Sequence, residues 1–242
     1  MCAWHAKPLD GYDRTSQEAI DNVMMLARAI MPLGWSIKSL AALLGNGAGE
    51  SGLNPWRWEN NYIPTYNEFL GWHGTVAQQH GYGLFGFTPA SSYINSTNEQ
   101  TYARYGYAPN FSDITGRATD GEAQTRYFIS TVEPNWSHGN HGYYWDNFNA
   151  IGVDIDTFYY MTYQEFMAGI DSHGNDIPLD YMTGAFELCY EKPADWAAAD
   201  SYDYRCSSAQ YWYDVLKDMP IPGTGGDSFN IMFYLKPKYK RM

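Results

Sequence analysis

The stretch Gly45-Asn-Gly-Ala-Gly-Glu-Ser-Gly-Leu-Asn-Pro55 follows directly on an apolar run, Leu40-Ala-Ala-Leu-Leu44. Ser36 stands before this run at a position suited to an N-cap, where its side chain can accept a hydrogen bond from the first helical turn. The apolar residues repeat with the spacing of one helix face. Together the two segments predict a buried helix that becomes irregular at its glycines and stops before Pro55.

Glu50 is the only ionisable residue between Lys38 and Arg57. Burial disfavours a charged carboxylate, and the C-terminal end of a helix carries partial negative charge, so both effects favour the protonated acid. A carboxylic acid that keeps its proton near neutral pH is what a glycosidase needs to protonate a leaving oxygen. The alternative is a glutamate in a glycine-rich turn without a chemical role, and the local sequence leaves both interpretations open.

The composition is that of a globular chain with many aromatic residues. The 242 residues, with 9 Trp, 22 Tyr and 11 Phe, suffice for one domain with a sizeable core or for a domain with a large insertion. Aromatic faces stack on sugar rings, although a tyrosine-rich core is the ordinary alternative. The sequence has no signal-peptide segment and no apolar run that could span a bilayer, which predicts a soluble protein. Any route out of the cell would then be one other than ordinary secretion.

The formal net charge of −12 argues against nucleic acid as a partner and against attraction to anionic membranes. The three cysteines, Cys2, Cys189 and Cys206, form no disulfide framework and lack the spacing of metal ligands. The sequence does not decide whether Cys189 and Cys206 pair.

Capping and spacing signals predict a chain made mostly of helices. Thr15-Ser-Gln-Glu18 is a capping box that opens a helix through Ile30, and this helix would form a hairpin with the one that precedes Pro55. Two further capping boxes open helices of about 10 residues, and two later stretches also have helical spacing. The boxes are Thr119-Asp-Gly-Glu122 and Thr162-Tyr-Gln-Glu165, and the later stretches run over 182–189 and 204–215.

Three other segments lack helical periodicity. Residues 56–82 are rich in Trp, Asn, Gly and His, which suits a binding surface. Residues 81–89 alternate short side chains among glycines and predict a tight strand or hairpin. Residues 133–156 predict a long surface loop, whose His138 and His141 offer too few ligands for a metal, so we expect no metal site.

Several separated motifs, in a fixed order, resemble those of a known family. Glu50-Ser-Gly-Leu-Asn-Pro55 and Gly81-Tyr-Gly-Leu-Phe85 resemble the Glu-Ser…Asn-Pro and Gly-Leu-hydrophobic-Gln signatures of goose-type lysozymes and lytic transglycosylases. The fuller resemblance, over residues 15–218, is to the phage tail lysozyme family, found at the tail tips of phages that infect Gram-positive bacteria. Its further motifs are Gly45-Asn46, Thr88-Pro-Ala-Ser-Ser-Tyr-Ile94, Gln124, Tyr190-Glu-Lys-Pro193 and Ala209-Gln-Tyr-Trp212.

The resemblance implies a mostly α, lysozyme-like α+β fold, in which a short β element lies beside the cleft of a helical bundle. The implied reaction is cleavage of the β-1,4 bond between N-acetylmuramic acid and N-acetylglucosamine, with Glu50 as general acid and no cofactor. The implied partners are peptidoglycan glycan strands and other phage tail proteins. The protein would act on the extracellular wall of the host, from a virion tail or after release at lysis.

The sequence also predicts the division of the chain. Residues 1–219 would form the catalytic domain and the Pro- and Gly-rich residues 220–227 a linker. Residues 228–242 would form a C-terminal tail or docking strand with a basic end.

A second carboxylate would stabilise the developing positive charge or activate water. Glu68, in the irregular segment, is the preferred partner of Glu50, and Glu59 is the alternative. Without such a partner, the substrate's 2-acetamido group would assist, as in lytic transglycosylases, and yield a 1,6-anhydro sugar. The expected substrate contacts, each of which also has a structural interpretation at a helix end or in the core, are Ser51, Tyr82, Phe85 and Tyr190.

Two positions depart from the family pattern. Gly86 stands where Gln is usual, which removes a side-chain amide contact to the sugar, and Phe87 stands where Trp is common. The first departure and the aromatic excess support a competing hypothesis, a non-catalytic tail-tip structural or glycan-binding protein. A metallopeptidase that uses His138 and His141 is a third and weaker hypothesis.

Overall fold

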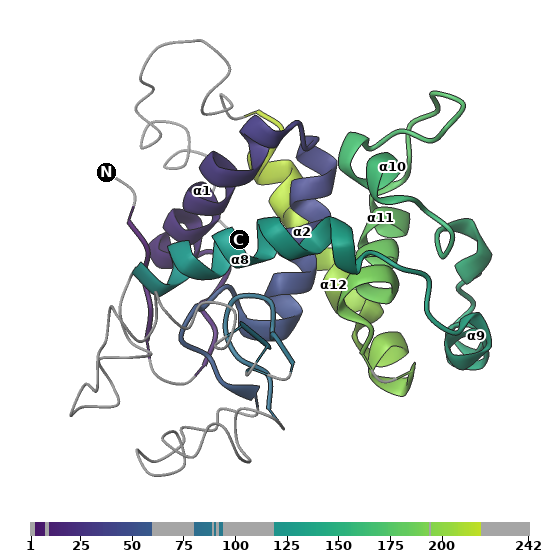
Figure 1. Cartoon of the computed structure of the whole chain (residues 1–242), viewed down its shortest axis with the longest axis horizontal. Coiled ribbons are helices and arrows are strands. Elements are labelled where there is room, and N and C mark those ends of the chain that lie inside the picture. The colour runs from purple at the N-terminus through teal and green to yellow at the C-terminus, as the bar shows by residue number, and fades with distance from the viewer. Residues whose placement is uncertain are drawn as a thin grey trace.

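The computed structural model describes residues 3–7, 10–59, 80–88, 90, 92–93, 119–193 and 195–218. It shows a bundle of helices around one central helix, α2 (Ile37–Ser51) (Figure 1). Ser36 caps this helix as predicted, since its Oγ accepts a hydrogen bond of 3.1 Å from the Ser39 N–H. Gly52, in the left-handed conformation with φ 57°, ends it. The sequence therefore places the start of the central helix correctly.

The glycines of α2 do not interrupt the helix; Gly45 lets a neighbouring helix come close. A Cβ atom on Gly45 would lie 2.5 Å from the carbonyl oxygen of Arg205 and 2.7 Å from the Cβ of Ala209, both on α12 (Asp195–Leu216). α12 and α11 (Leu179–Phe186) pack along α2. The expected loss of helical regularity is thus wrong, because close packing against α12 supports the helix through its glycine-rich half.

The remaining helices surround α2. In Figure 1, α1 (Gln17–Ile30) lies on the opposite side of α2 from α10 (Tyr163–Ala168) and α11, and α8 (Thr119–Asn135) crosses in front of α2. A short 3-10 turn, η1 (Met31–Leu33), links α1 to the segment before α2. Ser16 rather than Thr15 caps α1, whereas the capping box of Thr162 and Glu165 is confirmed.

Most of the predicted surface loop over 133–156 is helical, so that prediction is wrong. It contains the end of α8, all of α9 (His141–Ala150) and the start of η4 (Ile155–Thr157). The buried Tyr144 and Phe148, one helical turn apart, anchor α9. The ring centroid of Phe148 lies 5.4 Å from that of Tyr202 on α12. Asn140 provides no side-chain cap, so the local sequence carries no start signal.

The predicted β element is present in a reduced form. Tyr82 and Phe87 form an antiparallel bridge through two backbone hydrogen bonds of 3.2 and 3.0 Å, and Trp58 bridges Tyr82. No longer strand occurs among the described residues. The buried Gln124 ties this turn to the exit of α2, since its side chain accepts from the Leu84 N–H and donates to the Pro55 carbonyl, each at 2.7 Å. The turn 81–88 is thereby fixed beside the end of α2.

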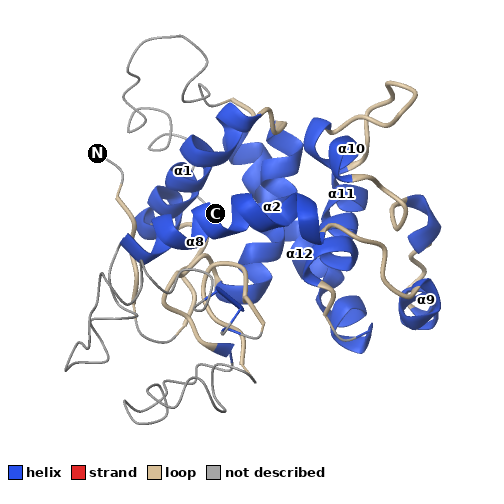
Figure 2. Cartoon of the chain, viewed as in Figure 1, coloured by secondary structure: helices blue, strands red, loops and turns tan. Residues whose placement is uncertain are grey.

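The described residues are mostly helical, which confirms the expected fold class (Figure 2). Many aromatic side chains fill the core; Trp35, for example, meets Phe166 edge to face at 5.4 Å between ring centroids. The core interpretation therefore accounts for much of the aromatic excess. Cys189 and Cys206 are both free thiols. None of the described helices has the length and apolar character needed to cross a membrane.

Candidate active site

Glu50 lies at the C-terminal end of α2 and faces a cleft of about 860 Å³. Its side chain is 26 % exposed. The turn 81–88 contributes Phe85 and Gly86 to the cleft, and the segment after α11 contributes Tyr190. The described residues therefore bring the end of the central helix and the glycine-rich turn to one cavity, as the sequence predicts.

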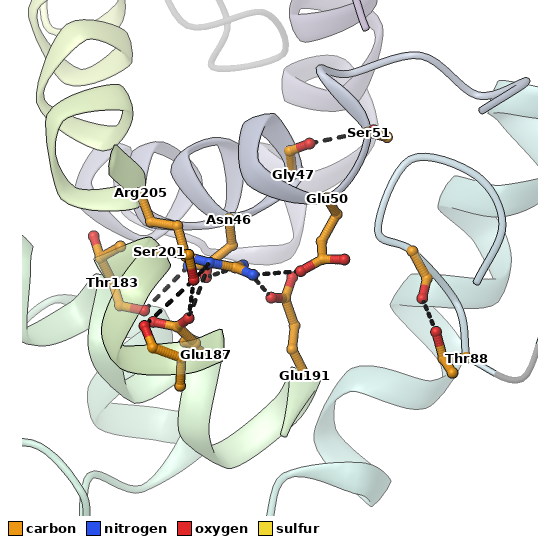
Figure 3. Close-up of polar contacts among 12 residues, drawn as sticks. Asn46, Gly47, Glu50, Ser51, Thr88, Thr183, Glu187, Glu191, Ser201 and Arg205 are labelled. Atoms are coloured by element: carbon orange, nitrogen blue, oxygen red, sulfur yellow. Dashed lines mark hydrogen bonds and ion pairs between the residues drawn. The ribbon is translucent and has the colours of Figure 1, made fainter. Parts of the chain in front are cut away.

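Gly86 touches the side chain of Glu50. It has φ +55°, and a Cβ atom at this position would lie 2.4 Å from Glu50 Oε2. The Thr88 hydroxyl donates a 2.7 Å hydrogen bond to the Gly86 carbonyl and holds the turn in place (Figure 3). A glutamine here would displace the carboxyl group, so the departure from the family pattern has a steric reason in this structure.

Arg205 of α12 joins Glu50 to two further carboxyl groups (Figure 3). Its Nη2 pairs with Glu50 Oε1, its Nη1 pairs with Glu191 Oε2, and its Nε lies 2.9 Å from Glu187 Oε1. Nη1 also donates to Asn46 Oδ1 at 2.9 Å. One guanidinium therefore serves three carboxyl groups from two elements, α2 and the π-helical turn η5 (Glu187–Glu191).

The two carboxyl groups of η5 are nearly inaccessible to solvent. The side chains of Glu187 and Glu191 are 0 % and 6 % exposed. Burial raises the pKa of Glu187 to about 7, against the opposing effects of Arg205 and of the Ser201 hydroxyl. Burial also raises the pKa of Glu191 well above its ordinary value, and Arg205 again opposes it. For Arg205, burial acts to lower the pKa, but the neighbouring carboxylates outweigh it and raise the pKa.

These shifts predict that the folded protein loses stability as the pH rises from about 5 to 8. The pKa of Glu187 is about 7 in the folded protein, whereas its ordinary value, which applies to the unfolded chain, is 4.5. The folded chain therefore binds this proton more tightly than the unfolded chain does. The resulting stability is complete below the unfolded pKa and is lost as the pH rises through the folded pKa. The expected loss in the free energy of unfolding is roughly 3 kcal/mol, measurable as a falling midpoint of thermal unfolding.

Glu187→Gln should flatten this dependence, because the amide does not titrate. Glu165 and Asp171 do not mask this dependence. Hydrogen bonds lower the pKa of each, so their contributions to stability change only in more acidic solution than that of Glu187. A midpoint that rises between pH 5 and 8 would contradict the buried, proton-holding state of Glu187.

The structure divides the predicted substrate contacts into two groups. Phe85 and Tyr190 line the cleft, whereas Tyr82 is 2 % exposed and lies against Trp58 with ring centroids 4.6 Å apart. Ser51 is 1 % exposed and donates to the Leu84 carbonyl at 2.8 Å, which favours its structural role. The hydroxyl of Tyr190 lies 3.4 Å from that of Thr131.

Of the two candidates for a second carboxylate, Glu59 belongs to the described residues. Glu59 lines the cleft, and its Oε2 accepts a 2.8 Å hydrogen bond from the Gly81 N–H. Glu68 lies outside the described residues. Within the described residues no group of three His, Cys, Asp or Glu side chains could hold a metal ion; His141 instead pairs with Asp156 at 2.8 Å.

Sequence reasoning did not find Arg205, Glu187 or Glu191 as parts of the site. The available signal was the position of Arg205, which shares helical spacing with the buried Ala209 and Trp212. An arginine on a buried helix face needs acidic partners. The sequence does not say which carboxyl groups those are, since Glu50 is 155 positions away.

Two comparisons show which known proteins the chain is similar to. A morphogenesis protein of Bacillus phage B103, Morphogenesis protein 1, is 23 % identical over 201 residues, which cover 83 % of this chain. The match spans only 40 % of the length of that relative. The phage tail lysozyme family matches residues 21–216, a region that contains the cleft, the central helix and the Arg205 network. The chain therefore belongs to the phage tail lysozyme family, whose general function is the lysis of peptidoglycan.

Proposed function

We propose that the protein cleaves the β-1,4 glycosidic bond between N-acetylmuramic acid and N-acetylglucosamine, with Glu50 as the general acid. The observation that carries this proposal is the position of Glu50: its carboxyl group projects from the end of α2 into the cleft, with Oε2 against the turn at Gly86. A general acid must reach the glycosidic oxygen from a fixed support. The Arg205 contact at Oε1 gives Glu50 that support and leaves Oε2 as the atom for proton donation.

The positive charge that develops on the sugar ring needs a second group. We propose Glu68 for this role and Glu59, which lines the cleft, as the alternative. Assistance by the 2-acetamido group of the substrate is the third route and would make the protein a lytic transglycosylase. Phe85 and Tyr190 are the proposed contacts for the sugar rings because they line the same cleft.

Mass spectrometry of the fragments released from Gram-positive peptidoglycan tests this function. A hydrolase yields reducing muramic acid ends, and a transglycosylase yields 1,6-anhydro ends that are lighter by one water. We expect glycan cleavage with reducing ends, unchanged by EDTA. Fragments cut only in the peptide, or activity abolished by the chelator, would overturn the proposal, and an absence of fragments from every wall tested would favour a glycan-binding protein.

The biological setting is also a proposal. The family suggests action on the host wall from a virion tail, and the matched relative is a phage morphogenesis protein. We propose peptidoglycan glycan strands as substrate and other tail proteins as partners, with the domain division at 219 and the tail 228–242 as predicted from the sequence. Release at host lysis is the alternative setting.

A further inference from the structure

The cleft contains two cations that its acidic groups do not neutralise, and the inference drawn from them rests on the function proposed above. Arg205 pairs with Glu50 and Glu191, which also line the cleft. The other two cations of the cleft lining are Arg57 and Lys192. Within the part of the chain that the structure describes, neither of them forms an ion pair with a carboxyl group. Their charges are therefore free to act on a ligand.

Lys192 is held at the cleft by neutral groups. Its Nζ donates to the Asn135 carbonyl at 3.1 Å and to the Ser137 hydroxyl at 2.6 Å, and both of these residues also line the cleft. An ammonium group has three N–H donors, so one of them remains for a ligand. Lys38 and Lys217, by contrast, each pair with an aspartate. The contacts of Lys192 thus orient its charge without neutralising it.

The backbone of Lys192 is also unusual. The residue ends the turn η5 in the left-handed conformation, with φ 51°. Glycine is the common residue at such a helix end, and a lysine adopts this conformation only rarely. The position gives up the conformational freedom of glycine and gains a cationic side chain at the cleft.

Arg57 belongs to the opposite wall of the cleft, where the turn 81–88 lies. Its carbonyl accepts a 2.8 Å hydrogen bond from the Gly83 N–H, which fixes the residue beside this turn. Its Nε is buried and has no hydrogen-bond partner among the described residues. The neighbouring Glu59 accepts from the Gly81 N–H instead. A buried donor without a partner is costly, so a ligand that accepts from Arg57 would remove that cost.

The two cations lie on different sides of Glu50. In Figure 3, Glu50 lies between Thr88, in the turn beside Arg57, and Glu191, which directly precedes Lys192. A glycan strand with its scissile bond at Glu50 extends to both sides of this residue. Substituents of the strand can therefore meet both cations while the bond is held at Glu50.

The chemistry of the strand decides which substituents these are. N-acetylglucosamine rings are neutral, whereas muramic acid carries a stem peptide with free carboxylates on its lactyl group. In Gram-positive walls some muramic acid residues also carry phosphate polymers. The net charge of −12 gives the chain as a whole no attraction to such anions, so their recognition needs local cations.

We propose that Lys192 and Arg57 form an anion-binding subsite for a charged substituent of muramic acid, a carboxylate of the stem peptide or a phosphate. The planar guanidinium of arginine binds either anion through paired hydrogen bonds, and the ammonium group of lysine binds them as a point charge. The subsite favours peptidoglycan over neutral glycans. It contacts the substituents of the strand and leaves the reacting bond to Glu50.

Binding of soluble glycan fragments tests the subsite. The ligands are neutral chitohexaose and peptidoglycan fragments with stem peptides, prepared with and without the phosphate polymer. Lys192→Gln should weaken the binding of a charged fragment at least about fivefold, since a hydrogen bond to a charged group is lost. It should leave the affinity for chitohexaose unchanged. Arg57→Gln should act in the same direction. Fluorescence titration measures the affinities, and each chain also carries Glu50→Gln so that the ligand is not consumed.

Lys7→Gln is the matched control. Its Nζ lies 4.8 Å from the ring centroid of Tyr12, and Lys7 is not among the residues that line the cleft. This change removes the same charge from the chain and should leave all affinities unchanged. Lys192→Arg keeps the charge and should retain the preference for charged fragments. High salt should weaken the binding of charged fragments by the chain with Lys192 more than by Lys192→Gln, because salt screens the lost interaction.

The ligands distinguish the sources of the anion. A loss with the polymer-free fragment assigns the subsite to a stem-peptide carboxylate, and a loss only with the polymer-bearing fragment assigns it to the phosphate. An equal loss for chitohexaose would show that Lys192 only supports the cleft wall. That result, or no loss with any charged fragment, in chains that remain folded by circular dichroism, would overturn the inference.

The outcome is separable from the proposed function. If Lys192→Gln does not fold, Arg57→Gln takes its place in every comparison. Unchanged affinities would refute only the subsite, because binding does not require cleavage. Cleavage of the ligand by Glu50→Gln would refute the general acid, and the same variants would then be compared by their KM values for charged and neutral fragments.

Discussion

Glu50→Gln is expected to lower the rate of cell-wall degradation by at least about 100-fold, because general acid catalysis contributes roughly two to four orders of magnitude. The amide is nearly isosteric and can still accept from Arg205, so the fold and the affinity for glycan should persist. It cannot give a proton to the leaving oxygen. Initial rates of turbidity loss measure the effect, and pull-down with insoluble peptidoglycan measures the binding.

Two further variants extend this experiment to the second carboxylate. A large loss in Glu68→Gln or in Glu59→Gln identifies the partner of Glu50, and mild effects in both, together with anhydro products, indicate participation by the substrate acetamido group. Retention by Glu50→Gln of more than about a tenth of the wild-type rate would be incompatible with general acid catalysis by this residue.

Arg205→Met is expected to lower the free energy of unfolding by about 3 to 5 kcal/mol at pH 8, since it leaves buried carboxyl groups without their cation. Methionine fills much of the space of the arginine stem but offers no hydrogen-bond donor. The loss should be smaller at pH 5, where Glu187 and Glu191 can take up protons in place of the missing partner. Denaturant unfolding at the two pH values measures both effects.

Arg126→Met is the comparison for this result. Arg126 pairs with Glu122 at the surface, and its side chain is 45 % exposed. Exposed pairs contribute about 0 to 1 kcal/mol, so this variant should be close to the wild type at both pH values. A similar, small effect for Arg205→Met would mean that the buried network contributes little to stability.

The parts of the fold that the sequence predicted well are those with local physical causes. Ser36 and Thr162 predict helix starts because their side chains accept hydrogen bonds from backbone N–H groups of the first helical turn. The sequence did not predict α9, because the Asn140 side chain makes no such hydrogen bond. The packing of Phe148 against α12 anchors this helix instead. Propensity is a weak guide where distant contacts decide the structure.

In the candidate site, too, the residue with a local sequence signal could be predicted, whereas the contacts between distant segments could not. Glu50 could be selected because it is the single ionisable residue in an apolar, glycine-rich stretch. The network around it could not be predicted, because Arg205 and the carboxyl groups of η5 meet only when α2, α12 and the end of α11 pack together. Gly86 looked like the loss of a sugar contact, and only the position of Glu50 Oε2 shows why a side chain does not fit there.

Because of the π-helical turn η5, the site depends on the number of residues in this turn as well as on their identity. The Lys192 N–H bonds to the Glu187 carbonyl at 2.8 Å, five positions back, so the turn contains one residue more than an α-helical turn requires. Deleting one residue here would restore α-helical geometry but rotate the following side chains by about 100° around the axis. Glu187 would stay beside Arg205 while the position of Glu191 faced elsewhere. The helical phase of this turn thus determines whether the second buried carboxyl group reaches the cleft, and a change in residue count here would disrupt the site even if every side chain named above were retained.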